Sequence, residues 1–422
     1  MKAVFRKLVL ESFRPLQGGI MEVFLPDGEK LIFGGARAGM RAVIRIQSEN
    51  FFQRCVLFGP IGFAEAYIDG EWETPDLAAV IGWFILNAED AGGMQTERGA
   101  KAPLLNLLNA YNRVLHQRRP NDLTTSKKNI SEHYDLSNDF FKLWLDPTMT
   151  YSSALFEPAE IDLQSAQIRK YDHLCQTLQL GPDDRLLEVG TGWGGFSIHA
   201  ASTYGCKITS ITISQRQHDE AVARIAAAGL TDRVDVLIED YRKVEGQFDK
   251  IVSIEMIEAV GDRFLDTYFD SLQRVLAPKG MIGLQMITCP DRQYRILRDG
   301  VDFIQKHIFP GSLLVAQARV TQALNRTGSL NLHSWKDMAP HYAKTLGLWC
   351  ERFEAAKDAV LALGFDERFI RKWRYYLRYC EAAFATRNIS VVQAVYTRPN
   401  NTGIVSPVYS LGPIAQPITT KL

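Results

Sequence analysis

The segment 185–200 reads Arg185-Leu-Leu-Glu-Val-Gly-Thr-Gly-Trp-Gly-Gly-Phe-Ser-Ile-His-Ala200. Its apolar residues Leu186, Leu187 and Val189 predict a short buried strand of a parallel sheet. A turn with four glycines follows this strand: Gly190, Gly192, Gly194 and Gly195. Helical character resumes at Phe196. The segment therefore has the strand, the tight turn and the helix start of a nucleotide-binding unit.

The acid Glu188 lies inside this segment and restricts the ligand that the turn would accept. Glycines let a ligand approach the backbone, and the helix N-terminus offers unpaired N–H groups. A carboxylate beside the turn repels a pyrophosphate but suits a positively charged ligand, such as the sulfonium and amino group of S-adenosylmethionine. Trp193 stands where an aromatic wall beside this donor is expected. The competing interpretation is a glycine-rich turn that binds nothing.

The composition bounds the class of protein. The chain has 422 residues, enough for two or three domains, and its 48 basic and 48 acidic residues do not favour a nucleic-acid partner. No stretch is long and apolar enough to span a bilayer, which predicts a soluble or membrane-surface protein of the cytoplasm. The six cysteines are scattered without a CxxC pair, so neither a metal site nor a disulfide framework is expected.

Strands and helices alternate from residue 185 to about residue 286, which predicts an α/β fold with a doubly wound, mostly parallel sheet. Further strands are expected at 207–213, 234–238, 248–254 and 281–287, and helices at 215–228 and 264–275. The second strand lacks the terminal acid of a dinucleotide fold, which disfavours NAD. It ends in Thr212-Ile-Ser-Gln-Arg-Gln217, whose neutral groups suit ribose or methionine atoms. Asp240 and Tyr241 follow the third strand, where they would hold an adenine.

The flanking segments divide the chain further. Four parts are predicted: a unit at 1–116, a linker at 117–128, a main domain at 129–398 and a loose tail at 399–422. The first unit has either a binding or docking role or serves only to stabilise the rest of the chain. The basic linker could contact anionic lipid headgroups. Its strands are expected at 21–25 and 41–47, and its helices at 77–88 and 104–117. In the main domain we expect an amphipathic helix at 162–178, an insertion at 290–332, helices from Trp335 and a last strand at 389–396.

Four motifs carry a family resemblance: His133-Tyr-Asp-Leu-Ser-Asn-Asp-Phe-Phe141, Leu187-Glu-Val-Gly-Thr-Gly-Trp-Gly-Gly195, Ile308-Phe-Pro-Gly311 and His341-Tyr-Ala-Lys-Thr-Leu-Gly-Leu-Trp349. Through them, residues 129–396 resemble the cyclopropane fatty acid synthases, including the mycolic acid cyclopropane synthases. The segment 62–72 looks like the N-terminal domain of the phospholipid-acting branch. The resemblance implies a Rossmann-like class I methyltransferase domain with a smaller N-terminal α+β lipid-binding domain. It also implies a peripheral protein on the inner face of the membrane, and it allows a homodimer.

The resemblance further implies S-adenosylmethionine as methyl donor and the double bond of an unsaturated phospholipid acyl chain as acceptor, which becomes a cyclopropane. The residues expected at the donor are Tyr151, Ser152, Glu188, Gly190, Gly192, Trp193, Gly194, Thr212, Ser214, Gln217, Asp240 and Tyr241. Methyl attack leaves a carbocation, which aromatic faces stabilise by roughly 0.5–2 kcal/mol each. Candidates for these faces are Phe140, Phe141, Tyr151, Tyr268 and Phe269. Ring closure then needs a base, and the resemblance implies a bound bicarbonate in this role.

The pocket that the resemblance assigns to bicarbonate departs from the family pattern. The predicted catalytic residues are Glu258, Ser153, Gln285, Ile287, Cys350 and Cys380. Three of them, Ser153, Gln285 and Cys350, stand where the family has cysteine, histidine and tyrosine. These departures weigh against ring closure and against bound bicarbonate. Cys380 matches the cysteine traditionally assigned as the family's active site, and we expect it to line the pocket because the chemistry needs no thiol nucleophile.

The departures leave the product open. The form Glu255-Met-Ile-Glu-Ala-Val260 resembles the subfamily that makes methyl- or methylene-branched fatty acids, in which the cation loses a proton elsewhere. Two interpretations from other classes compete with this enzyme. A catalytically inactive lipid-binding homologue is disfavoured by the intact glycine turn, and a small-molecule methyltransferase is disfavoured by the length of the match.

Overall fold

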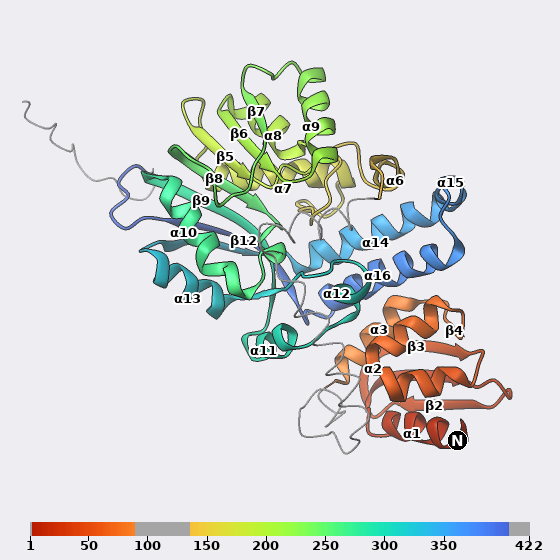
Figure 1. Cartoon of the computed structure of the whole chain (residues 1–422). Coiled ribbons are helices and arrows are strands. Elements are labelled where there is room, and N and C mark those ends of the chain that lie inside the picture. The colour runs from red at the N-terminus through yellow and green to blue at the C-terminus, as the bar shows by residue number, and fades with distance from the viewer. Residues whose placement is uncertain (1, 89–135, 405–422) are drawn as a thin grey trace, which may run out of the picture.

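The computed structural model describes residues 2–88 and 136–404, which form two β-sheets with helices packed on them (Figure 1). The larger sheet has the order β11-β12-β9-β8-β5-β6-β7, with β10 paired to β9. Its parallel part contains β5 (Arg185–Val189), β6 (Lys207–Thr212), β7 (Val234–Ile238), β8 (Phe248–Ile254) and β9 (Leu276–Cys289). Each of these strands overlaps its predicted segment. The Rossmann-like α/β class is thus confirmed.

The other end of this sheet is antiparallel, which the sequence did not predict. The predicted last strand is present as β12 (Ser390–Thr397), and it lies between β9 and β11 (Asn331–Asp337), antiparallel to both. The short β10 (Val315–Ala316) runs parallel to β9. The expectation of helix from Trp335 is wrong for its first residues, because Trp335 lies in β11. β11 is largely exposed, so it lacks the alternation of apolar side chains that marks a half-buried strand.

Helices cover both faces of the larger sheet. They are α7 (Leu163–Thr177), α8 (Gly195–Tyr204) and α9 (Gln215–Ala227) on one face, and α10 (Leu265–Val275) and α13 (Gln317–Thr327) on the other. Asp162 caps α7 by accepting a hydrogen bond from the Ser165 N–H at 2.9 Å, which explains where this amphipathic helix begins. On α10, Leu265, Phe269 and Leu272 are buried at helical spacing.

A further group of helices completes the fold, and part of this group surrounds an aromatic core. They are α6 (Asn138–Lys142), α11 (Asp291–Asp299), α12 (Phe303–His307), α14 (Ala339–Ala355), α15 (Lys357–Ala362) and α16 (Glu367–Ala385), with the 3-10 turns η1 (Ile257–Ala259) and η2 (Asp262–Phe264). The rings of Phe140 and Trp373 lie 5.0 Å apart between centroids, and those of Trp144 and Trp349 lie 5.6 Å apart. These contacts pack the segment around α6 against α14 and α16, although more than 200 residues separate them.

The N-terminal residues form the smaller sheet, in the order β2-β1-β3-β4. Its elements are α1 (Lys2–Phe13), β1 (Gly18–Phe24), β2 (Lys30–Gly34), β3 (Arg37–Ile46), α2 (Asn50–Ile68), β4 (Trp72–Glu73) and α3 (Leu77–Leu86). α2 and α3 lie beside α16 (Figure 1). There Arg371 donates to the Tyr67 carbonyl and to the Glu73 carboxylate at 2.7 Å each. The strands and the first helix predicted for this unit are confirmed, whereas the helix at 104–117 and the linker at 117–128 lie outside the described residues.

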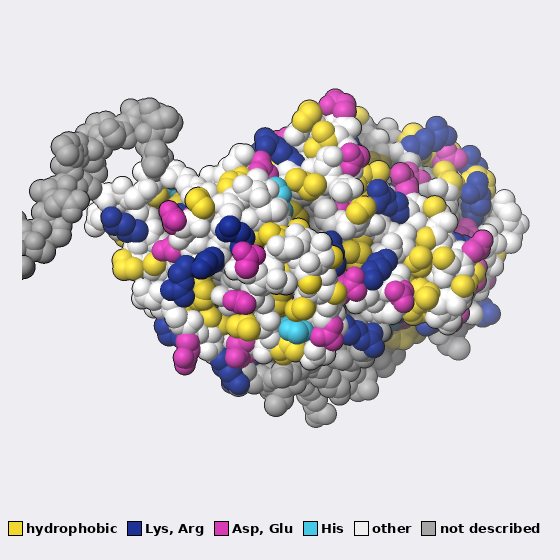
Figure 2. Space-filling model, turned by 90° about the horizontal axis from the view of Figure 1, so that it is seen from above, with side chains coloured by type: hydrophobic (Ala, Val, Ile, Leu, Met, Phe, Trp, Pro, Cys, Tyr) yellow, Lys and Arg dark blue, Asp and Glu magenta, His cyan; other side chains and the backbone are white. Residues whose placement is uncertain are grey.

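The charged side chains of the surface are mixed in sign. On the face that Figure 2 shows, basic and acidic side chains are interspersed, and no extended basic surface for a nucleic acid is visible there. This mixing agrees with the equal numbers of acidic and basic residues in the sequence. None of the helices in the described part of the chain combines the length and the apolar composition of a membrane span.

Candidate functional site

A cavity of about 400 Å³ lies at the carboxyl ends of β5, β6, β7 and β8. In a doubly wound sheet this edge is where ligands bind. The wall of the cavity includes the glycine turn, the ends of these strands, the insertion at 290–332 and residues of α14 and α16. One cavity therefore connects the predicted donor residues with a region formed by the last helices of the chain.

The glycine turn between β5 and α8 needs glycine for two physical reasons. Gly190 and Gly192, which line the cavity, have φ angles of 100° and 53°, in the region that side chains disfavour. A Cβ on Gly195 would lie 2.8 Å from the Thr148 carbonyl oxygen and 2.9 Å from the Tyr171 hydroxyl, so glycine lets α8 begin close to the preceding loop. The turn consequently leaves its backbone open toward the cavity.

Glu188 is buried at the end of β5 and lines the cavity. Burial raises its pKa to about 7, although the hydroxyls of Ser197 and Ser210 each donate to its Oε2 at 2.5 Å. A negative charge on Glu188 is therefore costly unless a cation lies beside it. This fits S-adenosylmethionine, whose ammonium and sulfonium charges would stabilise the ionised carboxylate. When bound, S-adenosylmethionine supplies an electrophilic methyl group.

The other predicted donor residues fall into two groups. Those that line the cavity are Tyr151, Ser152, Gly190, Gly192, Trp193, Thr212, Gln217, Asp240 and Tyr241. Gly194 and Ser214 lie outside the wall and occupy the N-cap positions of α8 and α9. Asp240, expected to bind adenine, forms an ion pair with Arg242 at 2.6 Å, so an adenine amine would have to share this carboxylate.

The wall of the cavity contributed by α14, α16 and the insertion is rich in aromatic rings. The hydroxyls of Tyr151 and Tyr376 lie 2.9 Å apart, and the Phe309 ring is 6.3 Å and 5.9 Å from their ring centroids. Further aromatic side chains of this wall are Tyr342, Tyr379 and Phe384. Of the aromatic residues predicted for cation stabilisation, only Tyr151 lines the cavity; the buried core holds Phe140, Phe141, Tyr268 and Phe269.

The predicted catalytic residues are also divided by the structure. Glu258, Ile287 and Cys380 line the cavity, and the Ile287 N–H donates to Glu258 Oε1 at 2.5 Å. Burial raises the pKa of the Cys380 thiol well above its usual range, so Cys380 is a poor nucleophile and acts as part of the wall. The other three predicted residues, Ser153, Gln285 and Cys350, are buried outside the wall.

Glu255 is a site residue that the sequence did not predict, although it is the first residue of the motif at 255–260. It directly follows β8, lines the cavity and has a φ of 48°, which is rare for a side chain other than glycine. Its Oε1 accepts from the Ser153 N–H at 2.9 Å and from the Gln285 amide at 2.7 Å, and its Oε2 accepts from the Tyr342 hydroxyl at 2.7 Å. Ser153 and Gln285 therefore meet at a carboxylate of the chain itself.

The bicarbonate implied by the resemblance does not fit these residues. The Ser153 N–H and the Gln285 amide, which a small anion would use, already bind Glu255. Glu258 is a second buried carboxyl group nearby, and burial together with the charge of Glu255 raises its pKa to about 8. The negative charge of Glu255 repels an added anion. No step of the reaction is assigned to bicarbonate.

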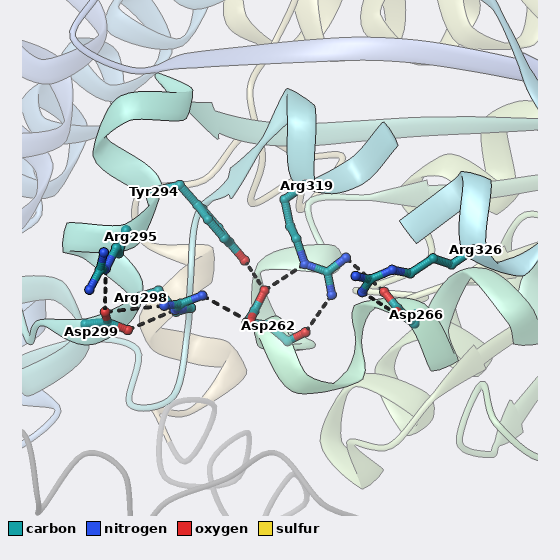
Figure 3. A network of polar contacts seen from close by, with 8 residues as sticks. All are labelled: Asp262, Asp266, Tyr294, Arg295, Arg298, Asp299, Arg319 and Arg326. Carbon is teal, nitrogen blue, oxygen red and sulfur yellow. Dashed lines mark hydrogen bonds and ion pairs between the residues drawn. The ribbon is translucent and has the colours of Figure 1, made fainter. Parts of the chain in front are cut away.

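The insertion at 290–332 forms one side of the cavity and is fastened to the sheet domain by charged groups (Figure 3). Asp262 of η2 accepts from Arg319 Nε at 2.8 Å and from the Tyr294 hydroxyl at 2.6 Å. Arg319 also donates to Asp266 of α10 at 2.8 Å. Leu297, on the same helix as Tyr294, lines the cavity. The network thus positions α11 and α13, and with them this part of the wall.

Comparisons with known proteins show the family of this chain. A family model for mycolic acid cyclopropane synthetase matches residues 121–394. The chain is 38% identical over 353 residues to tuberculostearic acid methyltransferase UfaA1 of Mycobacterium tuberculosis, which covers 79% of this chain and 78% of that protein. It is 35% identical over 402 residues to cyclopropane-fatty-acyl-phospholipid synthase of Escherichia coli, which covers 91% of this chain and 98% of that protein.

Solved structures show the same relationship. The crystal structure of mycolic acid cyclopropane synthase CmaA1 complexed with SAH and CTAB matches with a TM-score of 0.60 at 33% sequence identity, covering 64% of this chain and 98% of that chain. The chain therefore belongs to the mycolic acid cyclopropane synthetase family and is an S-adenosylmethionine-dependent methyltransferase.

Proposed function

We propose that this methyltransferase adds the methyl group of S-adenosylmethionine to the double bond of an unsaturated phospholipid acyl chain and forms a cyclopropane. The observation that carries this proposal is the single cavity in which the glycine turn and Glu188 face the same space as an aromatic wall and two carboxyl groups. The similarity to a cyclopropane-fatty-acyl-phospholipid synthase over nearly the whole chain supports the choice of acceptor.

The residues of the cavity suit this chemistry because an isolated alkene is a weak nucleophile. Such a reaction needs the methyl group and the double bond held in line, in a space that excludes water. Attack of the alkene on the methyl group leaves a carbocation on the acyl chain. The faces of Tyr151, Tyr376 and Phe309 would stabilise its charge, by roughly 0.5–2 kcal/mol each. Loss of a proton from the added methyl group then closes the ring.

A second candidate product is a methyl- or methylene-branched acyl chain. It requires the same methyl transfer, but a hydride then shifts so that the cation lies on the methyl-bearing carbon. Loss of a proton from the methyl group leaves a methylene branch, and loss of a proton from the neighbouring chain carbon leaves a methyl branch on a double bond. The replacement of the family's cysteine, histidine and tyrosine by Ser153, Gln285 and Cys350 favours this candidate. The similarity to a protein named tuberculostearic acid methyltransferase also favours it, because tuberculostearic acid is a methyl-branched fatty acid. The two products therefore differ in whether a hydride shift precedes the loss of the proton.

We further propose that the protein works as a peripheral protein on the inner face of the membrane, where its acceptor lies. The N-terminal unit, predicted at 1–116, would dock there, because it packs against α16 and so lies next to the helices that form the aromatic wall. The predicted boundary of this unit falls among residues that the structure does not describe.

The test is an incubation with methyl-labelled S-adenosylmethionine and vesicles of a monounsaturated phosphatidylethanolamine. The acyl chains are then analysed by mass spectrometry and proton NMR. We expect the label in the acyl chains, with the upfield signals of cyclopropane protons. Signals of a branched methyl or a methylene group instead would establish the second candidate. Vesicles with fully saturated chains are the control, and no label in the monounsaturated lipid would refute the proposed function.

A further inference from the structure

Glu255 and Glu258 are two carboxyl groups in one cavity, but their surroundings differ. Glu255 has a donor on each oxygen: Ser153 and Gln285 on Oε1, and Tyr342 on Oε2. Glu258 Oε1 accepts from the Ile287 N–H, whereas its buried Oε2 has no hydrogen-bond partner among the described residues. Donors directed at both oxygens stabilise a carboxylate, and an unpartnered buried oxygen favours the neutral acid.

A buried lysine adds to this difference. Lys170 of α7 is fully buried, and its Nζ donates to the Ser152 hydroxyl at 2.7 Å. Burial lowers the pKa of Lys170 to about 7, and the negative charge of Glu255 opposes this shift. The Lys170 cation favours the carboxylate form of Glu255 in return. Burial raises the pKa of Glu255 as well, but Glu258 carries the additional repulsion of Glu255, so one proton resides first on Glu258.

The donors of Glu255 come from three separate parts of the chain: the loop before α7, strand β9 and helix α14. This fixes the carboxylate at the wall of the cavity despite the uncommon backbone angle of Glu255. Backbone strain maintained by surrounding contacts is a feature of functional sites. A purely structural link between these three parts would not need an ionisable group that lines the cavity.

We propose that Glu255, held by Ser153, Gln285 and Tyr342, is the base that accepts the proton when the cation on the acyl chain collapses to product. The inference rests on the proposed function. In the step that closes the ring, a C–H bond of the added methyl group breaks, and its electron pair forms the new bond to the cationic carbon. In the step that gives a branched chain, a C–H bond beside the cationic carbon breaks, and its electron pair forms a double bond. The proton passes to a carboxylate oxygen of Glu255, and no oxidant, reductant or external anion is consumed. The chain itself thus supplies the base.

The first test compares Glu255→Gln with Glu258→Gln in the labelled-lipid assay, using the full-length protein. Glutamine cannot accept a proton, so we expect Glu255→Gln to lower kcat by at least about a hundredfold, the usual contribution of a general base. The dissociation constant of S-adenosylmethionine should stay within about twofold, since the base acts after methyl transfer. Glu258→Gln should cost less, because an amide resembles the neutral acid. A loss below tenfold in Glu255→Gln, or the reverse order of the two variants, would overturn the proposal.

The second test separates a base from a structural link and does not depend on the glutamine variant. Glu255→Ala removes the carboxylate and leaves space beside its three donors. Added formate should restore turnover at least about tenfold, whereas formamide, which is neutral and of similar size, should not. Equal restoration by both compounds, or by neither, would assign Glu255 a structural role. If the wild-type protein leaves the lipid unlabelled, the proposed function is refuted. If the wild-type protein labels the lipid and Glu255→Gln is still active, only the role of Glu255 is refuted.

Discussion

At the scale of single residues, the raised pKa of Glu188 predicts that the binding of S-adenosylmethionine depends on pH. Because burial raises its pKa to about 7, this carboxyl group is largely neutral below pH 7 while the site is empty. A cationic donor binds the ionised form, so its affinity should rise as pH increases. We expect the dissociation constant of S-adenosylmethionine, measured by calorimetry, to be about tenfold larger at pH 6 than at pH 8.

The variant Glu188→Gln checks that prediction. It should bind the donor at least about tenfold more weakly at pH 8, because a charge-assisted contact is lost, and its affinity should no longer change with pH. Glu245→Gln, which changes an exposed acid, is the control and should keep the pH dependence of the wild-type protein. Donor binding by the wild-type protein that is equal at pH 6 and pH 8 would contradict the role of Glu188.

The same scale shows what the sequence could and could not reveal about the site. Glu188 and Glu258 were predicted because each lies in a contiguous motif whose chemistry is readable locally. The surroundings of Glu255 were not predictable in this way, since its donors are 102, 30 and 87 positions away in the chain. The sequence showed that Ser153 and Gln285 departed from the family. Only the fold showed that both bind one carboxylate.

At the scale of elements, the attachment of the insertion depends on Arg319. Its guanidinium bonds to both Asp262 and Asp266 and is only 12% exposed. Arg326 also reaches Asp266, at 3.2 Å, but it is 56% exposed. We expect Arg319→Ala to lower the free energy of unfolding by roughly 2–3 kcal/mol and Arg326→Ala by about 0.5 kcal/mol. Urea denaturation followed by circular dichroism measures both, and equal losses would mean that the network does not hold α13.

The elements themselves were predictable where burial imposes a pattern. The sequence located all five parallel strands β5 to β9, and in four of them, β5, β6, β8 and β9, most apolar side chains are buried. β11 was not predicted because it is an exposed edge strand. Its sequence, Asn331-Leu-His-Ser-Trp-Lys-Asp337, does not alternate regularly between apolar and polar residues. The aromatic wall of the cavity was not predicted for another reason. α16 is amphipathic, and the spacing of its apolar residues predicts which face of the helix is buried. The spacing does not show that Tyr376, on this helix, lines a cavity instead of packing in the core.

At the scale of the whole molecule, the N-terminal unit contacts the insertion through Glu65 of α2. Its Oε1 accepts from Lys306 Nζ at 2.7 Å and from His307 Nε2 at 2.9 Å, both on α12. Burial alone would raise the pKa of Glu65, but the bonds from His307 and Lys306 outweigh it and lower the pKa to about 2. The sequence did not predict this contact, because residues 65 and 306 belong to separately predicted units.

The sign of this shift determines how stability depends on pH. The pKa of Glu65 is depressed from its ordinary value of 4.5, so its contribution is complete above pH 4.5 and is lost as pH falls toward 2. Because the group is partly exposed, we expect Glu65→Gln to lower the free energy of unfolding by only about 1–2 kcal/mol at pH 7. The difference from the wild-type protein should begin to narrow below pH 4.5. Urea titrations at pH 7, 5 and 4 measure it.

The exposed Glu11→Gln is the matched control for this experiment, since among the described residues Glu11 forms an ion pair only with Lys7 on its own helix, at 3.9 Å. It should leave the free energy of unfolding unchanged within about 0.5 kcal/mol at each pH. If Glu65→Gln were equally neutral, α12 would be held against α2 by apolar contacts alone. Phe303 of α12, whose ring centroid lies 4.8 Å from that of Tyr375 of α16, would still attach α12 to α16. A loss confined to Glu65→Gln instead makes this ion pair one of the links between the N-terminal unit and the wall of the cavity.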